Sequence, residues 1–408
     1  MAETEDSLRR SHKQLQVARQ AWPLAKNYYK KARQAHQEKK LIGWHLGISP
    51  YELLHALNVL PVMPENFSSV LAAKRMIDHY LEKADLLGYS RTQCSLHHTI
   101  LGYALSGEEL MIPPPDFILA TNNPCDVTSR SFLPVQKHLN IPYYYLDVPY
   151  HWDTTEGGEP EEAQIDYCIG QLKEVITFIE NLTGKPLDEE HFQETFQFAA
   201  QAYGLWREIS ELRKVIPCPM GAVEEFGTLY PLLQLVGTRE AVGFYQMLLA
   251  EVQQRVKEKK GILPGEEKHR LLWVGSVPYY DSGMLNYVEE FDSLVVKADV
   301  GSPYEISFDP DRPLESLARK AIVHTFNAPL EYRIRTIQRQ VREYHLEGVI
   351  FYAHVSCRNF CGGVKAIQDA LWEELNIPSL LIEGDMIDKA GYSAVVTRER
   401  IREFLNTL

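Results

Sequence analysis

Three of the six cysteines in this 408-residue chain stand in loops, just after predicted elements. They are Cys94 in RTQCSLHH, Cys125 in NNPCDVTS and Cys357 in HVSCRNFC. A thiolate binds metals, and a thiol at the amino end of a helix is accessible and has its pKa lowered by the helix dipole. This position favours metal ligation over disulfide formation. The alternative for each single cysteine is an inert core residue, because free cysteine is often buried.

The neighbouring segments predict how two of these cysteines are positioned. Residues 117–122 (FILATN) form a short apolar run that ends in turn residues, which is typical of a buried strand, and the following Pro124 leads to Cys125. Residues 349–355 (VIFYAHV) lead to Cys357 in the same way. Open α/β sheets place their ligand sites at the carboxyl ends of the strands. We therefore expect these two cysteines, from separate halves of the chain, to converge across one crevice.

The other three cysteines are further candidate ligands. Cys361 lies four residues after Cys357, so both sulfurs share one face if a helix starts near Cys357. Cys218 lies between two prolines, and Cys168 opens a predicted helix. The alternative is that Cys168 and Cys361 pack between helices and that Cys218 fills a turn. The chain has no Cys-x-x-Cys pairs with zinc spacing, so we do not expect a structural zinc ribbon.

The composition excludes several classes of protein. Charged residues make up 24% and hydrophobic residues 45% of the chain, which is typical of a globular protein. A net charge of -13 argues against nucleic acid as a partner, because phosphate binding requires a basic face. No apolar run approaches the roughly 18 residues of a membrane span, and the first residues are polar rather than leader-like. We expect a cytoplasmic protein with no membrane partner.

Hydrophobic periodicity predicts an α/β fold with two sheets and a helical segment between them. Predicted strands include LIGWHLG, FILATN and YYYLDV in the first half and RLLWVGS, SLVVKADV, VIFYAHV and SLLIEGD in the second. Residues 68–87 are predicted to form one helix, and residues 165–260 are helical in pattern. The predicted division is a helical segment over 1–40, an α/β domain over 41–164, a helical segment over 165–262 and a second α/β domain over 263–408.

The motifs together resemble a known family. GWHLGISPYELLHALNVLPV, then one cysteine, NNPCD, HVSCRNF and IEGDMIDKAGYS look like the benzoyl-CoA reductase and 2-hydroxyacyl-CoA dehydratase family, and the match runs through most of the chain. The resemblance implies two Rossmann-like domains with an iron–sulfur cluster in the cleft between them. It also implies that Cys94, Cys125 and Cys357 hold a four-iron four-sulfur cluster with one iron free for chemistry.

The resemblance also implies partners. A separate ATP-hydrolysing iron–sulfur activator delivers a low-potential electron to such proteins, and this chain has no phosphate-binding Gly-rich loop of its own. The chain is therefore expected to accept electrons, to reduce a small molecule and to be sensitive to oxygen, as in an anaerobic enzyme. A homodimer is expected, because two-fold dimers are the commonest soluble assembly and the family works as paired subunits.

The number of cysteines favours one branch of the family. Double-cubane cluster proteins hold two bridged cubanes (8Fe–9S) with six cysteines, and this chain has six. The resemblance therefore favours an ATP-dependent two-component reductase with a double-cubane cluster. One alternative is a single-cubane (4Fe–4S) subunit of a 2-hydroxyacyl-CoA dehydratase or benzoyl-CoA reductase. The other is a non-enzymatic cluster carrier.

Polar residues near the cysteine motifs are further candidates. His45 replaces a hydroxyl residue of the dehydratase pattern and is a candidate catalytic proton donor, or else the cap of a strand. Arg358 and Asn359 follow Cys357 and could hold an anionic cluster or ligand by charge-assisted hydrogen bonds. His97 and His98 are candidate hydrogen-bond donors to cluster sulfur, with one of the two expected to face solvent.

Overall fold

Two parallel sheets are formed by the residues that the computed structural model describes, which are 10–46, 49–108, 112–125, 127–153 and 158–408. Sheet A has the strand order β2-β1-β3-β4 and consists of β1 (Ile42–His45), β2 (Leu60–Val62), β3 (Phe117–Thr121) and β4 (Tyr143–Leu146). Sheet B has the order β6-β5-β7-β8 and consists of β5 (His269–Gly275), β6 (Ser293–Ala298), β7 (Gly348–His354) and β8 (Ser379–Gly384). Both sheets thus have the same winding.

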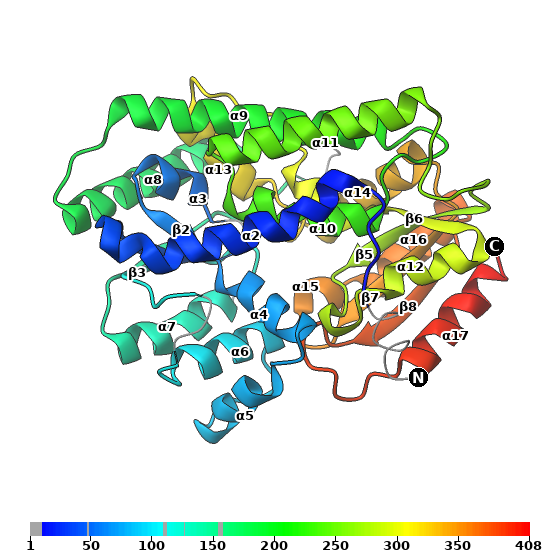
Figure 1. Ribbon diagram of the computed structural model, residues 1–408, viewed down its shortest axis with the longest axis horizontal. Coiled ribbons are helices and arrows are strands. Elements are labelled where there is room, and N and C mark those ends of the chain that lie inside the picture. Colours follow the sequence, from blue (N-terminus) through cyan, green and yellow to red (C-terminus); the bar gives the residue numbers. More distant parts are fainter. Residues whose placement is uncertain (1–9, 47–48, 109–111, 126, 154–157) are drawn as a thin grey trace.

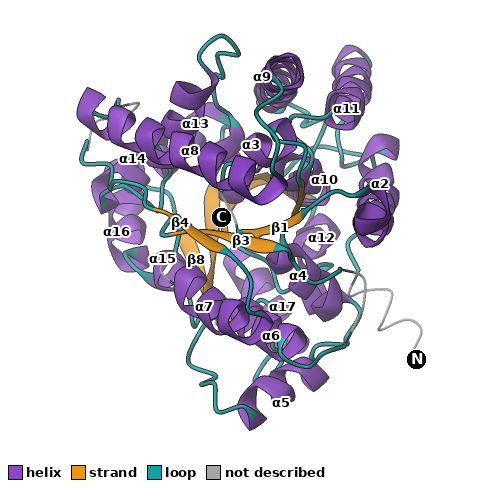
Figure 2. Cartoon of the chain, turned by 90° about the vertical axis from the view of Figure 1, so that its left-hand side faces the viewer, coloured by secondary structure: helices purple, strands orange, loops and turns teal. Residues whose placement is uncertain are grey.

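The strands form where the sequence has continuous apolar runs. Every residue of β1, β3, β5, β6 and β7 is buried. Parallel sheets carry helices on both faces, so their strands need no polar side. Figure 2 shows this arrangement for sheet A, with α3 and α8 on one side and α6 and α7 on the other. The predicted α/β class with two Rossmann-like domains is confirmed.

The helices of the first half surround sheet A. They are α2 (Gln16–Gln34), α3 (Tyr51–Ala56), α4 (Pro64–Ala73), α5 (Asp78–Leu86), α6 (Ser95–Ala104) and α7 (Val127–Leu139), with the short 3-10 helix η1 (Ala35–Glu38) after α2. The prediction of one helix over residues 68–87 is wrong. The helix breaks between α4 and α5, where Arg75 has a left-handed backbone with φ 58°, a conformation that cannot continue a right-handed helix.

Four helices connect the two sheets, as the sequence predicts. They are α8 (Glu162–Thr183), α9 (Glu189–Leu212), α10 (Ala222–Gln234) and α11 (Arg239–Lys257). Helices α9 and α11 lie side by side along one edge of the molecule (Figure 1). The loop that contains Pro217 separates α9 from α10, because proline lacks the backbone donor that a helix needs.

The helices of the second half are shorter. They are α12 (Met284–Tyr287), α13 (Pro313–Ile322), α14 (Leu330–Glu343), α15 (Arg358–Cys361), α16 (Val364–Leu375) and α17 (Ala394–Leu405), with 3-10 helices η2 (Tyr279–Asp281), η3 (Val288–Phe291) and η4 (Asp299–Tyr304). Among the described helices, none is long and apolar enough to cross a membrane. The predicted boundaries at residues 40, 164 and 262 stay predictions.

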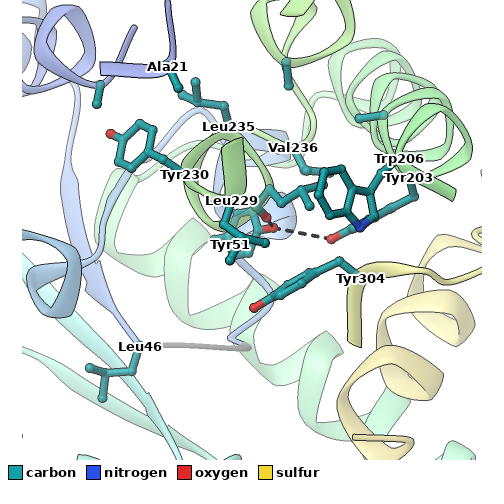
Figure 3. Packing of buried hydrophobic residues seen from close by; sticks show 14 of the residues in the cluster. Ala21, Leu46, Tyr51, Tyr203, Trp206, Leu229, Tyr230, Leu235, Val236 and Tyr304 are labelled. Carbon is teal, nitrogen blue, oxygen red and sulfur yellow. Dashed lines mark hydrogen bonds between the residues drawn. The ribbon is translucent and has the colours of Figure 1, made fainter. Parts of the chain in front are cut away.

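One large hydrophobic core joins the parts of the chain. Figure 3 shows a section of it, in which Ala21 of α2, Tyr51 of α3, Trp206 of α9, Leu229 of α10 and Tyr304 of η4 pack together. These residues come from the amino-terminal helix, the first sheet's helices, the helical segment and the second half. The parts are therefore held in one fixed arrangement, which fixes the distance between the ends of the two sheets.

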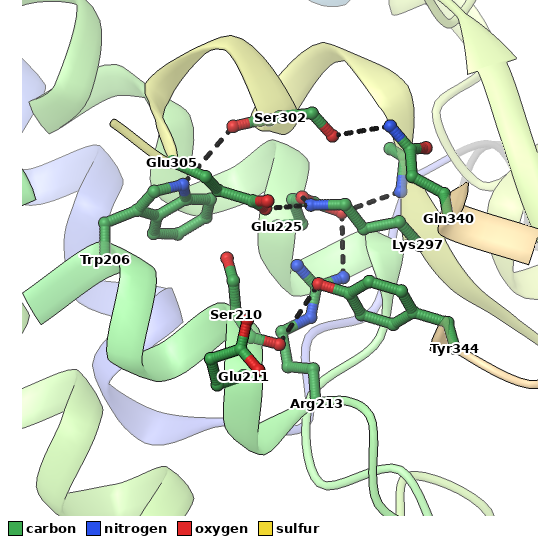
Figure 4. A network of polar contacts seen from close by, with 12 residues as sticks. Trp206, Ser210, Glu211, Arg213, Glu225, Lys297, Ser302, Glu305, Gln340 and Tyr344 are labelled. Carbon is green, nitrogen blue, oxygen red and sulfur yellow. Dashed lines mark hydrogen bonds and ion pairs between the residues drawn. The ribbon is translucent and has the colours of Figure 1, made fainter. Parts of the chain in front are cut away.

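A buried ionic cluster attaches the helical segment to sheet B (Figure 4). Glu225 of α10 accepts hydrogen bonds from Arg213 Nη2 at 2.8 Å, Lys297 Nζ at 2.9 Å and the Ala298 amide at 2.7 Å. The side chains of Arg213, Glu225 and Lys297 are fully buried. Burial alone would raise the pKa of Glu225, but Arg213 and Lys297 outweigh burial and lower it to about 2. The cluster therefore stays ionised at neutral pH.

Candidate metal centre

Four of the six cysteines line one cavity of about 630 Å³, which we call the cysteine cavity. Cys125 follows β3 of sheet A, and Cys357 follows β7 of sheet B. Cys94 precedes α6, and Cys361 ends α15. The cavity therefore lies where the carboxyl ends of strands from both sheets meet, which is the usual ligand position in open α/β sheets.

The cysteines of the cavity are partly buried. Cys94, Cys125 and Cys357 are half-buried, whereas Cys361 is exposed. Burial raises the pKa of Cys94 well above its ordinary value and also raises the pKa of Cys357, although backbone amides of α6 and α15 act in the opposite direction. The prediction that the helix dipole lowers the pKa of the thiol is wrong for Cys357, because loss of hydration exceeds the effect of the amides.

The arrangement of the thiols fits a polynuclear cluster. Cys94, Cys125 and Cys357 line the same cavity, and the charges of Cys357 and Cys125 further raise the pKa of Cys94. Within the described residues, no group of three or more Cys, His, Asp or Glu side chains is close enough to hold one metal ion. In a cluster each thiolate binds a different iron, so the ligands surround a space. A cationic cluster core would also neutralise the thiolates as their protons are released.

Side chains from the second half of the chain form and stabilise one wall of the cysteine cavity. Both Arg358 and Asn359 line it. The Asn359 side-chain amide donates to the carbonyl oxygen of Pro124, which joins α15 to the loop that carries Cys125. Arg333 of α14 donates to the carbonyl oxygen of Asn359 at 2.6 Å. The two predicted residues are thus at the site, and Asn359 also connects the two halves of the chain.

His354, the last residue of β7, is a residue that the sequence analysis missed. It is fully buried, and its Nε2 lies 3.7 Å from Cys94 Sγ and 3.0 Å from Ser356 Oγ. The amide of Met386 donates to His354 Nδ1 at 3.3 Å. A histidine at the carboxyl end of a predicted strand, three residues before Cys357, was the signal that could have identified it.

His97 and His98 lie in the interior of the protein, and their role as hydrogen-bond donors to cluster sulfur stays a prediction. Both are buried, so the expectation that one of them faces solvent is wrong. His97 Nε2 lies 3.1 Å from Glu65 Oε1, and His98 Nε2 lies 2.9 Å from Asp85 Oδ1. Each ring therefore pairs with a carboxylate, and His97 reaches the wall of the cysteine cavity while His98 does not line it.

Cys168 and Cys218 lie outside the cysteine cavity, in the hydrophobic core. Burial raises the pKa of Cys168 to about 12 and that of Cys218 to about 11. Cys218 Sγ donates to the carbonyl oxygen of Met220 at 3.1 Å, and its amide donates to Glu267, just before β5 begins. The amino end of β5 is separated from the cavity by the length of the strand, about 20 Å for seven residues. The structure does not bring these two cysteines to the other four.

His45 lies at the carboxyl end of β1 and is also fully buried. Its Nε2 is 3.5 Å from Gln234 Nε2, and its ring packs against Tyr51. Burial lowers the pKa of His45 to about 3, so its ring is neutral. It is not among the described residues that line the cysteine cavity. This position matches the alternative of a histidine at a strand end more closely than that of a proton donor to the cavity.

A second cavity of about 390 Å³ adjoins the cysteine cavity, and we call it the apolar pocket. The two share part of their walls: Glu65, Leu96, Phe360 and Met386. The rest of the apolar pocket is mainly hydrophobic, with residues such as Phe226, Leu233 and Val277. A ligand whose polar part reaches the cysteines therefore has space for an apolar part beside them.

Comparisons with known enzymes relate the chain to dehydratases and reductases. The alpha subunit of (R)-phenyllactyl-CoA dehydratase from Clostridium sporogenes is 26% identical, over 91% of this chain and 90% of the relative. The alpha subunit of (R)-2-hydroxyisocaproyl-CoA dehydratase from Clostridioides difficile is 25% identical, over 93% of both chains. One of the subunits of benzoyl-CoA reductase from Thauera aromatica is 24% identical, over 96% of this chain and 94% of the relative.

The family is also identified directly. The family model for the D-component of 2-hydroxyglutaryl-CoA dehydratase matches residues 48–408, which includes all six cysteines and every strand except β1. The resemblance inferred from the motifs is thereby confirmed, and the homologues support an enzyme. The chain belongs to the 2-hydroxyglutaryl-CoA dehydratase D-component family.

Proposed function

We propose that the chain is the iron–sulfur catalytic subunit of an enzyme that dehydrates 2-hydroxyacyl-CoA thioesters or reduces a related acyl-CoA. The observation that supports it most is the meeting of four cysteines from both halves of the chain around one cavity. The named relatives are dehydratases of hydroxyacyl-CoA substrates or a reductase of benzoyl-CoA. A non-enzymatic carrier would not need a ligand pocket beside its cluster, whereas an apolar pocket adjoins this one.

The proposed ligands of one 4Fe–4S cluster are Cys94, Cys125 and Cys357, with Cys361 at the same cavity. When bound, a cluster with three thiolate ligands supplies single electrons and an iron with an open position for a substrate oxygen. The double-cubane cluster favoured by the cysteine count requires six ligands, and two of the six cysteines are core residues. The geometry therefore supports the single-cubane alternative better.

The surrounding residues have defined tasks in this proposal. Arg358 and Asn359 at the cavity wall offer donors to an anionic ligand. The apolar pocket takes the hydrocarbon part of the acyl group and excludes water from it. Glu65 lines both cavities, so its carboxylate stands between the two parts of such a substrate. The polar wall of the cysteine cavity and the apolar wall of the second pocket thus orient the substrate together.

Partners are part of the same proposal. The relatives are named as subunits of larger enzymes, so a second subunit, either different or a second copy of this chain, is proposed to complete the enzyme. A separate ATP-hydrolysing iron–sulfur activator is proposed to deliver the electron. No Gly-rich phosphate loop occurs in this chain, which is consistent with such a division of labour.

Iron and acid-labile sulfide per chain, measured on protein prepared without oxygen, test the proposal. The expected result is about four irons and four sulfides per chain, unchanged in a Cys218→Ala variant. About eight irons and nine sulfides, with a loss in the variant, would support the double cubane instead. A chain without iron after anaerobic preparation and reconstitution would refute the cluster.

A further inference from the structure

We infer that His354 is a positioning residue that donates a hydrogen bond from Nε2 to the sulfur of Cys94 and thereby raises the reduction potential of the cluster. The inference rests on the proposed function and goes beyond it, because it assigns a task to a residue that binds neither iron nor substrate. It comes from the contacts of one buried ring: Nε2 lies 3.7 Å from Cys94 Sγ, within the range of a hydrogen bond to sulfur.

The backbone fixes which nitrogen of His354 carries the proton. The amide of Met386, just after β8, points its hydrogen at His354 Nδ1 at 3.3 Å. An amide can only donate, so Nδ1 must accept, and in a neutral ring the proton then lies on Nε2.

Asp385 does not compete for this proton. Its Oδ2 is 3.7 Å from His354 Nδ1, which is longer than an ordinary hydrogen bond between nitrogen and oxygen. Its other oxygen already accepts from Ser95 Oγ at 2.6 Å and from the amides of Ile387 and Asp388. The carboxylate thus organises the loop after β8, and this loop holds the Met386 amide that sets the tautomer.

Ser356 Oγ, 3.0 Å from Nε2, is another acceptor for this proton. A neutral hydroxyl is a weaker acceptor than a thiolate, since charge-assisted hydrogen bonds are about twice as strong. Once Cys94 is a thiolate ligand, its sulfur attracts the proton more than Ser356 does. The ring is held in this orientation by its complete burial and by the Met386 amide at Nδ1.

The expected effect is electrostatic. A hydrogen bond to a cluster ligand withdraws negative charge from it, and the reduced state of the cluster carries the greater negative charge. Donation from His354 therefore stabilises the reduced state and makes the cluster easier to reduce. His354 belongs to sheet B, whereas Cys94 belongs to the first half of the chain. The reduction potential of the cluster therefore also depends on how the two halves are positioned relative to each other.

The test is the midpoint potential of the reconstituted cluster in this chain, measured by redox titration with electron paramagnetic resonance. His354→Leu removes the donor and is expected to lower the potential. His354→Gln keeps an amide N–H near the position of Nε2 and is expected to stay close to the wild type. His269→Leu, another buried histidine on sheet B but at its amino end, is the matched control and is expected to leave the potential unchanged.

An unchanged potential in His354→Leu, with iron content equal to that of the wild type, would overturn the inference and leave the proposed function intact. Absence of iron in the wild type would refute both. Since His354→Leu can fail to fold, wild-type protein labelled with ¹⁵N-histidine gives a second measurement. Pulsed electron paramagnetic resonance of the reduced cluster is expected to detect a weakly coupled ¹⁵N nucleus, and its absence would also overturn the inference.

Discussion

Arg333 is the buried cation behind the cysteine cavity. Its Nη1 donates to the carbonyl oxygen of Asn359, whereas Nε and Nη2 have no hydrogen-bond partner among the described atoms. Burial lowers the pKa of Arg333, and Asp299, Cys357 and Cys361 act in the opposite direction. An arginine stays protonated at neutral pH, so this charge lies beside two candidate cluster ligands and supports their thiolate form.

Arg333→Leu is expected to destabilise the protein without iron by about 1–3 kcal/mol, because the partly buried carbonyl of Asn359 loses its donor. Urea unfolding monitored by circular dichroism measures the change. Arg342→Leu, an exposed arginine at the end of the same helix, is the control and is expected to change stability by less than about 0.5 kcal/mol. Equal effects of the two substitutions would contradict the structural role of Arg333.

The sequence indicated some of the site residues and not others, for a physical reason. Cys125 and Cys357 follow apolar runs that form strands, so local patterns predicted their position at a sheet edge. The roles of His354 and Arg333 depend on contacts with the loop after β8 and with α15, which are distant in sequence, and no local pattern encodes such contacts. Cys168 and Cys218 have the same residue type as the ligands, and only their burial in the core distinguishes them.

At the level of elements, the buried ionic cluster of Figure 4 determines how the helical segment meets sheet B. Glu225 of α10 holds both Arg213 of the preceding loop and Lys297 of β6. Among the described residues, Glu225 is the fully buried carboxylate that pairs with both cations. Lys297 also pairs with Glu305, but the side chain of Glu305 is partly exposed. Removal of Glu225 would therefore leave two cations poorly compensated in the interior.

Glu225→Gln is expected to lower the free energy of unfolding by roughly 3–5 kcal/mol, the usual cost of breaking a buried ion pair. The matched control is Glu211→Gln, whose exposed pair with Lys214 is worth at most about 1 kcal/mol. Denaturant unfolding of both variants compares them directly. A loss below about 1 kcal/mol in Glu225→Gln would contradict the account of this contact.

Glu289 in η3 gives the protein a pH-dependent element. Burial raises the pKa of Glu289 to about 7, although a hydrogen bond from Asn286 acts in the opposite direction. Between the ordinary pKa of glutamate and pH 7, the folded state therefore holds a proton that the unfolded state has lost. Stability from this residue is present below about pH 4–5 and is lost as the pH rises to about 7.

Glu289→Gln is expected to remove this part of the pH dependence. Unfolding free energies of the wild type and the variant, measured at intervals between about pH 4.5 and 7.5, should differ most at the upper end, where the variant is more stable relative to the wild type than at the lower end. A difference that is constant with pH would show that Glu289 titrates normally.

The strands were predictable because most of them contain a continuous apolar run, as in residues 117–121 and 348–354. The break between α4 and α5 could not be predicted, because residues 74–77 contain no proline or glycine and the apolar spacing continues across them. The helix ends there because Arg75 adopts a left-handed backbone, a choice that tertiary packing rather than local sequence makes.

At the scale of the whole molecule, two sheets of identical winding direct their carboxyl ends toward one site. Cys125 follows the third strand of sheet A, and Cys357 follows the third strand of sheet B, so the two occupy equivalent places in the two halves. Contacts that cross between the halves surround the cavity, including Ser95 with Asp385 and Asn359 with Pro124. A bound cluster would thus connect the halves covalently through its thiolates.

Iron removal is expected to lower the thermal stability of the whole protein. A ligand that binds only the folded state stabilises it by about 3 kcal/mol once it is present at about 100 times its dissociation constant. Calorimetry before and after chelation under reducing conditions should show a single transition that moves to lower temperature. A transition that stays in place on loss of iron would contradict a cluster held by both halves.

The location of the cluster is tested most directly by the iron content of two single-cysteine variants prepared without oxygen. Cys357→Ala removes a thiol of the cysteine cavity, and Cys168→Ala removes a thiol of the core. We expect Cys357→Ala to lose most of its iron and Cys168→Ala to retain as much as the wild type. Retention of iron by Cys357→Ala, or an equal loss from Cys168→Ala, would contradict the assignment of the cluster to this cavity.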